Sequence, residues 1–172
     1  MKILRNIIIC SCTLLVSLCT GCYHIGSMMH PDVKSIAVAP VVNETTAYNA
    51  SMNMRKALLE QFMRDGSLKL VNQKAADCIM YGRIINVDVV MVINDQEDHG
   101  DTYIPQEWKA TVKYEFSVII PGRKEPLVSK REVSGSANFQ VQADMNPNQL
   151  NGIYAACQDA AYNAVVATTE AW

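Results

Sequence analysis

Residues 108–120 alternate between apolar and mostly polar side chains more strictly than any other part of the chain. The apolar positions are Trp108, Ala110, Val112, Tyr114, Phe116, Val118 and Ile120, and the intervening positions are Lys109, Thr111, Lys113, Glu115, Ser117 and Ile119. Successive side chains of a β-strand point to opposite faces, so this strand has one face on a core and one face largely in water. The chain must therefore fold around a sheet that is covered on one side only.

Two neighbouring segments are predicted to pair with this strand. Cys78–Ile93 is long and apolar, and Leu127–Val141 carries apolar residues on one face, with Gly135 as a candidate bulge. Proline and glycine in residues 121–126 are typical of a turn. The three segments are therefore predicted to form an antiparallel meander.

The remaining elements flank this meander. Lys34–Val42 is predicted to be a buried strand, and a helix over Ser51–Arg64 should end at the left-handed cap of Gly66. The last helix is predicted over Asn146–Glu170, with an inner stripe of Leu150, Ile153, Cys157, Ala160, Ala161, Ala164, Val165 and Thr168. The predicted fold class is α+β: a small, mostly antiparallel sheet, built from a strand–helix unit and a three-stranded meander, with two helices on one face.

The N-terminus has the features of a bacterial lipoprotein signal peptide. A basic start precedes an apolar stretch, residues 7–18, that is shorter than the roughly 20 residues of a transmembrane helix. Two small residues stand directly before Cys22, as in a lipobox, whereas cleavage at Cys19 would place bulky Leu18 at the small-residue position. We expect residues 1–21 to be removed and Cys22 to carry the lipid, palmitate included. An uncleaved anchor or an ordinary secretory signal is the alternative.

The rest of the chain is predicted to be a tether, residues 22–33, followed by a single domain, residues 34–172. Without Lys2 and Arg5 of the signal peptide, the 15 Lys and Arg residues fall to 13 against 17 acidic residues, a net charge of −4. Nucleic-acid-binding proteins normally carry a basic surface, so we do not expect a nucleic-acid partner.

Cys78 and Cys157 are the two cysteines that follow Cys22. In an oxidising compartment they could form a disulfide, whereas their apolar surroundings favour two free, buried side chains. Both states remain open, because spatial adjacency cannot be read from the sequence.

No constellation of residues predicts catalysis or a bound cofactor other than the lipid on Cys22. Nucleophile-elbow, phosphate-loop and paired-cysteine motifs are absent from the sequence. His99 stands among Asp95, Glu97, Asp98, Asp101 and Glu107, but this spacing matches no known set of metal ligands. We therefore expect neither an enzyme nor a metal site. A hydrolase or metal carrier that uses His99 is the alternative from another functional class.

Basic residues gather near the turn between the last two strands, at Arg123, Lys124, Lys130 and Arg131. If the first two strands are parallel through a right-handed crossover, this turn lies where the first strand begins, near the tether. The acidic loop 95–101 then lies at the opposite end. Fixed cations could contact an anion such as lipid phosphate, although solubilising turn charge is the simpler interpretation.

Several short segments, taken in their order, resemble a known family. They are Cys22-Tyr23-His24, Pro31-Asp32-Val33-Lys34-Ser35-Ile36-Ala37-Val38, Asn43-Glu44-Thr45, Arg64-Asp65-Gly66-Ser67-Leu68-Lys69-Leu70-Val71 and Ala75-Ala76-Asp77-Cys78-Ile79-Met80-Tyr81-Gly82. The chain resembles LptE, the lipopolysaccharide-assembly lipoprotein, over about the first half of the mature chain, and the second half resembles it in element order. The chain departs from the family pattern in having no glycine or other small residue between Cys22 and Tyr23.

The resemblance implies a non-enzymatic lipoprotein, held by the lipid on Cys22 at the periplasmic face of the outer membrane. It implies two partners: a large LptD-like β-barrel whose lumen the domain plugs, and lipopolysaccharide, whose delivery it assists. Charge placement alone assigns the four basic residues to lipopolysaccharide. Another lipoprotein adaptor with a similar strand–helix start, such as a peptidoglycan-synthase activator or a curli-secretion component, is the alternative.

Overall fold

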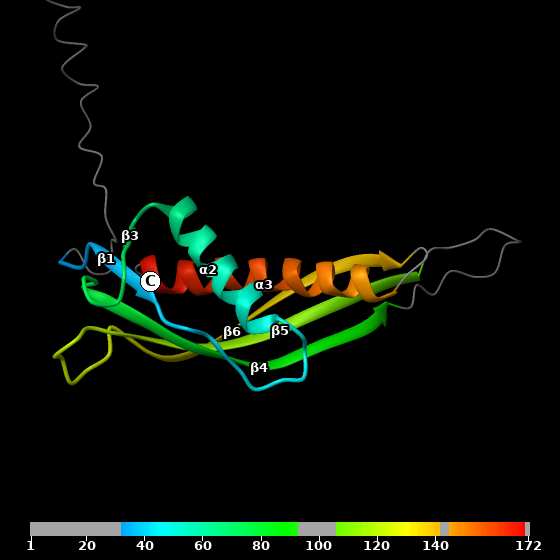
Figure 1. The fold of residues 1–172 in the computed structure, drawn as a ribbon, viewed down its shortest axis with the longest axis horizontal. Coiled ribbons are helices and arrows are strands. Elements are labelled where there is room, and N and C mark those ends of the chain that lie inside the picture. Colours follow the sequence, from blue (N-terminus) through cyan, green and yellow to red (C-terminus); the bar gives the residue numbers. More distant parts are fainter. Residues whose placement is uncertain (1–31, 93–105, 142–144, 171–172) are drawn as a thin grey trace, which may run out of the picture.

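The computed structural model describes residues 32–92, 106–141 and 145–170. Its elements are β1 (Ser35–Val38), β2 (Val42–Asn43), α2 (Ala50–Asp65), β3 (Lys69–Leu70), β4 (Cys78–Val92), β5 (Gln106–Ile119), β6 (Val128–Val141) and α3 (Met145–Thr169). Both helices lie on the same face of one sheet (Figure 1). The predicted α+β class and one-sided helical layer are therefore confirmed.

The sheet is mixed, so the prediction of a mostly antiparallel sheet is confirmed for the meander but not for the short strands beside it. Its strand order is β3-β1-β4-β5-β6, with β2 beside β4. β4, β5 and β6 form the predicted antiparallel meander, but β1 is parallel to both β3 and β4, and β2 is also parallel to β4. The chain passes through α2 between β1 and β4, and a crossover of this kind returns the next strand in the same direction.

The predicted first strand, residues 34–42, is two short strands. Pro40 lies between β1 and β2, and proline has no N–H to donate to a neighbouring strand. β2 then leads into a turn in which the Asn43 side-chain oxygen accepts hydrogen bonds from the Thr45 N–H (3.0 Å) and hydroxyl (2.7 Å). This local bond ends the strand and turns the chain toward α2.

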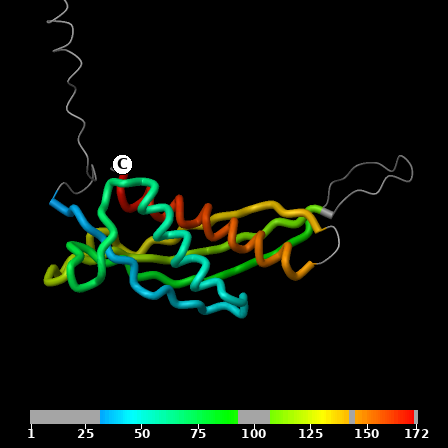
Figure 2. The backbone as a smooth tube through the Cα atoms, turned by 45° about the horizontal axis from the view of Figure 1, so that its top comes forward, coloured from blue at the N-terminus to red at the C-terminus, as the bar shows by residue number. Residues whose placement is uncertain are grey.

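The ends and faces of the helices follow the predicted pattern with one exception. Gly66 ends α2 at a φ of 71°, with its N–H donated to the Phe62 carbonyl. The α3 stripe from Ile153 to Thr168 is buried as predicted, but Leu150 is 42% exposed. Its position near the start of α3 lies beyond the part of the sheet that α2 covers (Figure 2).

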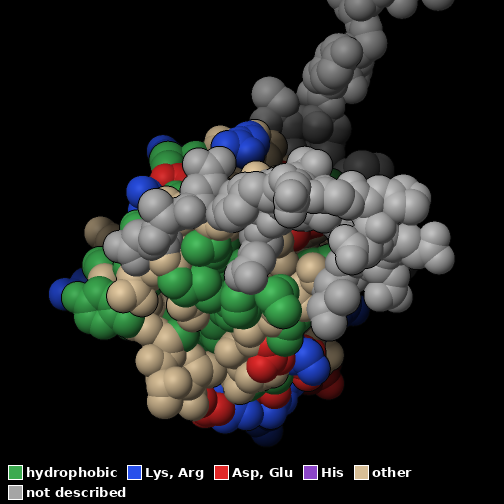
Figure 3. All heavy atoms as spheres, turned by 90° about the vertical axis from the view of Figure 1, so that its right-hand side faces the viewer, with side chains coloured by type: hydrophobic (Ala, Val, Ile, Leu, Met, Phe, Trp, Pro, Cys, Tyr) green, Lys and Arg blue, Asp and Glu red, His purple; other side chains and the backbone are tan. Residues whose placement is uncertain are grey.

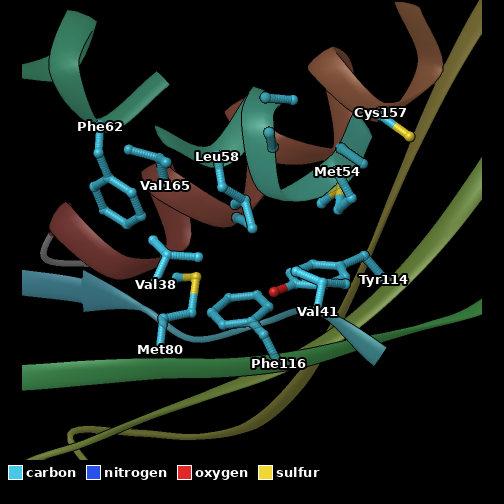
Figure 4. Close-up of a cluster of buried hydrophobic side chains, with 14 of the residues drawn as sticks. Val38, Val41, Met54, Leu58, Phe62, Met80, Tyr114, Phe116, Cys157 and Val165 are labelled. Atoms are coloured by element: carbon cyan, nitrogen blue, oxygen red, sulfur yellow. The ribbon is translucent and has the colours of Figure 1, made fainter. Parts of the chain in front are cut away.

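The core lies between the helical layer and the inner face of the meander (Figure 4). Phe62 and Leu58 of α2 pack there beside the sheet, where the rings of Tyr114 and Phe116 stack with centroids 5.8 Å apart. The two cysteines within the described residues, Cys78 and Cys157, are buried and free.

Gly135 does not mark a bulge, contrary to expectation. The irregularity between β5 and β6 lies between Phe116 and Val118, whereas Gly135 pairs regularly with Val112. A Cβ atom at Gly135 would lie 2.4 Å from the Ala156 carbonyl oxygen of α3. The missing side chain therefore lets α3 lie directly on β6.

The domain is elongated along its strands (Figures 1 and 2). We call the end of the sheet that holds Ser35 and Cys78 the basal end, and the end that holds Val92 and Val141 the distal end. β4 has 15 residues, which corresponds to about 50 Å of extended chain. α3 runs along most of this length, whereas α2 covers mainly the basal part. Within the described residues, none of the helices is long and apolar enough to cross a membrane.

Candidate functional site

The basic turn lies at the basal end of the sheet, as predicted. β5 ends opposite the start of β4, where Ile119 pairs with Ile79, and β1 begins beside the same part of β4. Gly122 permits the turn with a φ of 86°, and the Arg123 N–H is donated to the Ile120 carbonyl. Arg123 and the adjoining Lys124 are exposed at its tip.

The four predicted contact residues do not form one cluster. The Lys130 ammonium lies 2.8 Å from the Glu115 carboxylate on the open face of the sheet. Arg131 pairs across the strands with Phe116, a core residue, so its side chain is directed to the helix-covered face. Of the four residues, only Arg123 and Lys124 lie together, at the tip of the turn, and Lys130 forms an ion pair with Glu115.

An ion-pair network lies on the open face of the sheet, and sequence reasoning missed it. Glu115 accepts from both Lys130 and Arg83, the latter at 2.7 Å, and Arg83 also donates to Glu44 at 2.8 Å. The network joins β4, β5 and β6 to Glu44, the residue that follows β2. It carries two positive and two negative charges, so it neutralises part of the basic surface that the sequence suggested.

The network shifts the pKa of two of its members. Hydrogen bonds, first from Arg83 and then from Lys130, lower the pKa of Glu115. The same contact with Glu115, followed by the contact with Glu44, raises the pKa of Arg83. Arg83 and Glu115 therefore stay charged near neutral pH, and this pair offers fixed charge rather than a proton donor or acceptor.

A shallow pocket of about 320 Å³ lies over the network. Its lining includes Val42 and Tyr81, which are 57% and 44% exposed. The sequence contained a usable signal, because Arg83 and Glu115 both lie in predicted strands. Pairing them required the register of β4 on β5, which strand periodicity does not provide.

A second, larger groove of about 670 Å³ lies toward the distal end. Val87 and Val89 of β4 form one wall, Leu150 and Ile153 of α3 form the other, and Tyr48 lies at the loop before α2. Viewed from the distal end, apolar side chains gather on this part of the surface (Figure 3). The groove exists because α2 begins before the sheet ends.

Several predicted features lie outside the described residues. These are Cys22, which we expect to be lipidated, the adjoining Tyr23-His24 pair, and the acidic loop with His99. Within residues 32–92, 106–141 and 145–170, no group of three His, Cys, Asp or Glu side chains could hold a metal ion. The described site thus consists of charged and apolar surface.

Comparison with known proteins places this architecture in a family. Residues 33–168 match the LptE family, which is described as lipopolysaccharide-assembly. The chain belongs to the LptE family. The match includes both helices of the described structure almost to the end of α3, so it extends over the second half of the chain, where the sequence resemblance was limited to element order. The sequence matches none of the curated proteins with which it was compared.

Solved structures share the fold of this LptE-family chain at low sequence identity. A hypothetical protein from Chlamydia trachomatis has a TM-score of 0.53 at 9% identity, covering 80% of this chain and 97% of its own. A protein from Xanthomonas campestris has a TM-score of 0.52 at 9% identity, with coverages of 79% and 85%. A minor lipoprotein from Acinetobacter baumannii reaches 0.47 at 11% identity, with coverages of 77% and 89%. The first two support the fold alone.

Proposed function

We propose that this LptE-family protein is a non-enzymatic outer-membrane lipoprotein that plugs and helps assemble the LptD-like β-barrel through which lipopolysaccharide reaches the cell surface. The family match over residues 33–168 carries the proposal. In it, Cys22 holds the domain by its lipid at the periplasmic leaflet, and the domain occupies the barrel lumen.

The shape of the domain supports a plug. A strand of 15 residues spans about 50 Å, which exceeds the roughly 30 Å of a bilayer's hydrocarbon core. A domain of this length can fill a barrel from one rim to the other.

The open face of the sheet has the polarity that such a lumen requires. Lys109 and Lys113 are exposed there, and Thr111 and Ser117 are partly exposed beside them. The interior of an outer-membrane barrel is polar, whereas its outer surface is apolar. This face therefore suits a barrel interior, with the ion-pair network of Glu44, Arg83, Glu115 and Lys130 toward its basal half.

Co-purification from native membranes tests the proposal. The full-length lipoprotein, tagged at its C-terminus, should be recovered with a large outer-membrane barrel after mild detergent extraction. A tagged lipoprotein of unrelated fold serves as the control and should recover no barrel. Recovery of this protein alone, from membranes that contain an LptD homologue, would contradict the plug role.

A further inference from the structure

The two long edges of the sheet differ in whether other parts of the chain hydrogen-bond to their main-chain groups. At β6, Asp159 of α3 accepts from the Ser136 N–H at 2.9 Å, and the Asn163 amide donates to the Ser134 carbonyl at 2.9 Å. Side chains of α3 thus occupy main-chain groups that an added strand would need. Natural proteins commonly protect edge strands from pairing with other chains in this way.

The opposite edge lacks such protection in its distal half. β2 pairs with β4 only as far as Ile84, whose carbonyl accepts from the Glu44 N–H at 3.1 Å. Among the described residues, no strand lies beside β4 on this side from Asn86 to Val92. About half of β4, the longest of the described strands, therefore has no described strand beside it on this edge.

The main-chain groups on this edge can be assigned from the register. The Met80 and Ile84 carbonyls face β1 and β2, away from β5. After the irregularity between Ile84 and Asn86, the equivalent positions are Val87, Val89 and Met91, opposite Val112, Ala110 and Trp108. Hydrogen-bonding direction alternates along an antiparallel pair, so these three residues direct N–H and C=O toward the open side.

Two of these three residues also direct their side chains into the distal groove. Val87 and Val89 line it, together with Leu150 and Ile153 of α3. A strand added beside β4 would continue the line of β2, and every second side chain would enter the groove. Asp88 and Val90, on the other face, would adjoin its remaining side chains.

We propose that the β4 edge, residues 86–92, binds an extended segment of the barrel partner as an additional strand, with apolar side chains at alternate positions in the distal groove. The inference rests on the proposed function for the identity of the partner. A lipid chain could fill the groove but would leave the three N–H groups unpaired, whereas an extended peptide satisfies both features.

A second copy of this chain fits the surface less well. Two β4 edges could pair about a two-fold axis at Val89, but β2 limits the pairing to residues 86–92. A stable dimer usually buries about 800 Å² on each partner, and one short strand edge supplies much less. A partner segment that also enters the 670 Å³ groove buries more surface.

Photo-crosslinking in the full-length protein tests the inference. Tyr48, at the groove, and Tyr162, on the outer side of α3, are 72% and 52% exposed, so each can be replaced by a photoreactive phenylalanine. The Tyr48 position should crosslink to the barrel protein, and Val89→Pro should abolish that product, because proline removes an N–H that β5 does not use. Val89→Ala keeps the N–H, so it should retain the Tyr48 product. Any crosslink from the Tyr162 position to the barrel should form both with and without Val89→Pro.

Other crosslinking results would overturn the inference or the proposed function. A Tyr48 crosslink that survives Val89→Pro, joins two copies, or joins Tyr48 to residues 93–105 of its own chain overturns the inference. If Val89→Pro lowers the amount of folded protein, Leu150→Glu blocks the opposite wall of the groove and should also abolish the product. A barrel that co-purifies without a Tyr48 crosslink overturns the inference alone, whereas absence of a co-purifying barrel overturns the proposed function and this inference with it.

Discussion

Two glycines in the sheet are required by what packs over them. A Cβ at Gly82 would lie 2.0 Å from the Tyr114 hydroxyl, and one at Gly135 would lie 2.0 Å from the Ala160 backbone nitrogen. Neither glycine has a positive φ. Their lack of a side chain, rather than their backbone freedom, brings a ring and a helix close to the strands.

Gly135→Ala should destabilise the domain, because backbone atoms of α3 cannot move aside independently. We expect the free energy of unfolding to fall by about 1–3 kcal/mol, the usual cost of overpacking, as measured by chemical denaturation. Gly152→Ala is the matched control. The three atoms nearest to its Cβ all belong to the Phe139 ring, which can rotate, and alanine favours the helix by about 1 kcal/mol. Equal losses in both variants would contradict this explanation.

Tyr114→Phe should leave the domain as stable as the wild type or more stable. The Tyr114 hydroxyl is buried, and it has no hydrogen-bond partner among the described residues. An unpaired buried hydroxyl costs about 1–3 kcal/mol, and phenylalanine keeps the ring stacked on Phe116. Thermal unfolding would measure the change. A clearly lower melting temperature would mean that the hydroxyl has a partner outside the described residues.

At the scale of elements, Asp77 joins the starts of β1 and β4. One of its carboxylate oxygens accepts from the Lys34 N–H (3.1 Å), the Ser35 N–H (2.9 Å) and the Ser35 hydroxyl (2.7 Å). The hydrogen bond from the Ser35 side chain, followed by that from the Lys34 backbone, lowers the pKa of Asp77 below its ordinary value of 3.8. The charged carboxylate is therefore the form that holds the two strands together.

This linkage predicts an acid-dependent loss of stability. Because the folded pKa of Asp77 is depressed, its stabilisation is present above its ordinary pKa of 3.8 and is lost as the pH falls through the folded pKa. Asp77→Asn should lower the melting temperature at pH 7, and its difference from wild type should shrink below about pH 4. A difference that stays constant from pH 7 to pH 3 would exclude this role.

Periodicity predicted most elements to within two residues of the observed ends, because buried faces repeat with the period of the helix or strand. Periodicity failed where contacts between distant elements determine strand pairing or the burial of a side chain. β3 became an edge strand through pairing with β1, and Leu150 is exposed because α2 does not reach it. The open-face network depends on cross-strand register, so only Lys130 of its members was singled out, and then as part of a basic cluster.

The whole molecule has two unlike ends. β1 begins at the basal end, where the turn with Arg123 and Lys124 lies, and α3 also ends there (Figure 1). The distal end carries the groove and the free β4 edge. If residues 22–33 form the proposed lipid-anchored tether, the domain is held with its basal end closest to the membrane surface.

Reversing the charge of the basic turn tests its proposed contact with lipopolysaccharide. Arg123→Glu with Lys124→Glu should weaken binding of lipopolysaccharide by the full-length protein in detergent by roughly tenfold, about 1.4 kcal/mol. Lys109→Glu with Lys113→Glu changes the net charge equally on the open face and should have a smaller effect. If both pairs weaken binding equally, net charge rather than the turn controls affinity.

Membrane attachment should depend on one cysteine. Cys22→Ser removes the thiol that we expect to be acylated, so the protein should lose its lipid mass and should no longer be processed at this site. Cys19→Ser should remain lipidated. Mass spectrometry and membrane fractionation measure both effects. Lipid on the Cys22→Ser variant would place the anchor elsewhere.

The reactivity of the two buried cysteines can report local opening of the folded domain. Burial raises the pKa of both Cys78 and Cys157 to about 12, so the reactive thiolate is scarce in the native state at neutral pH. An alkylating reagent can therefore reach them only when the sheet or α3 opens locally. The ratio of labelling at the two positions would show whether the basal strands or the long helix separates first, without any added probe.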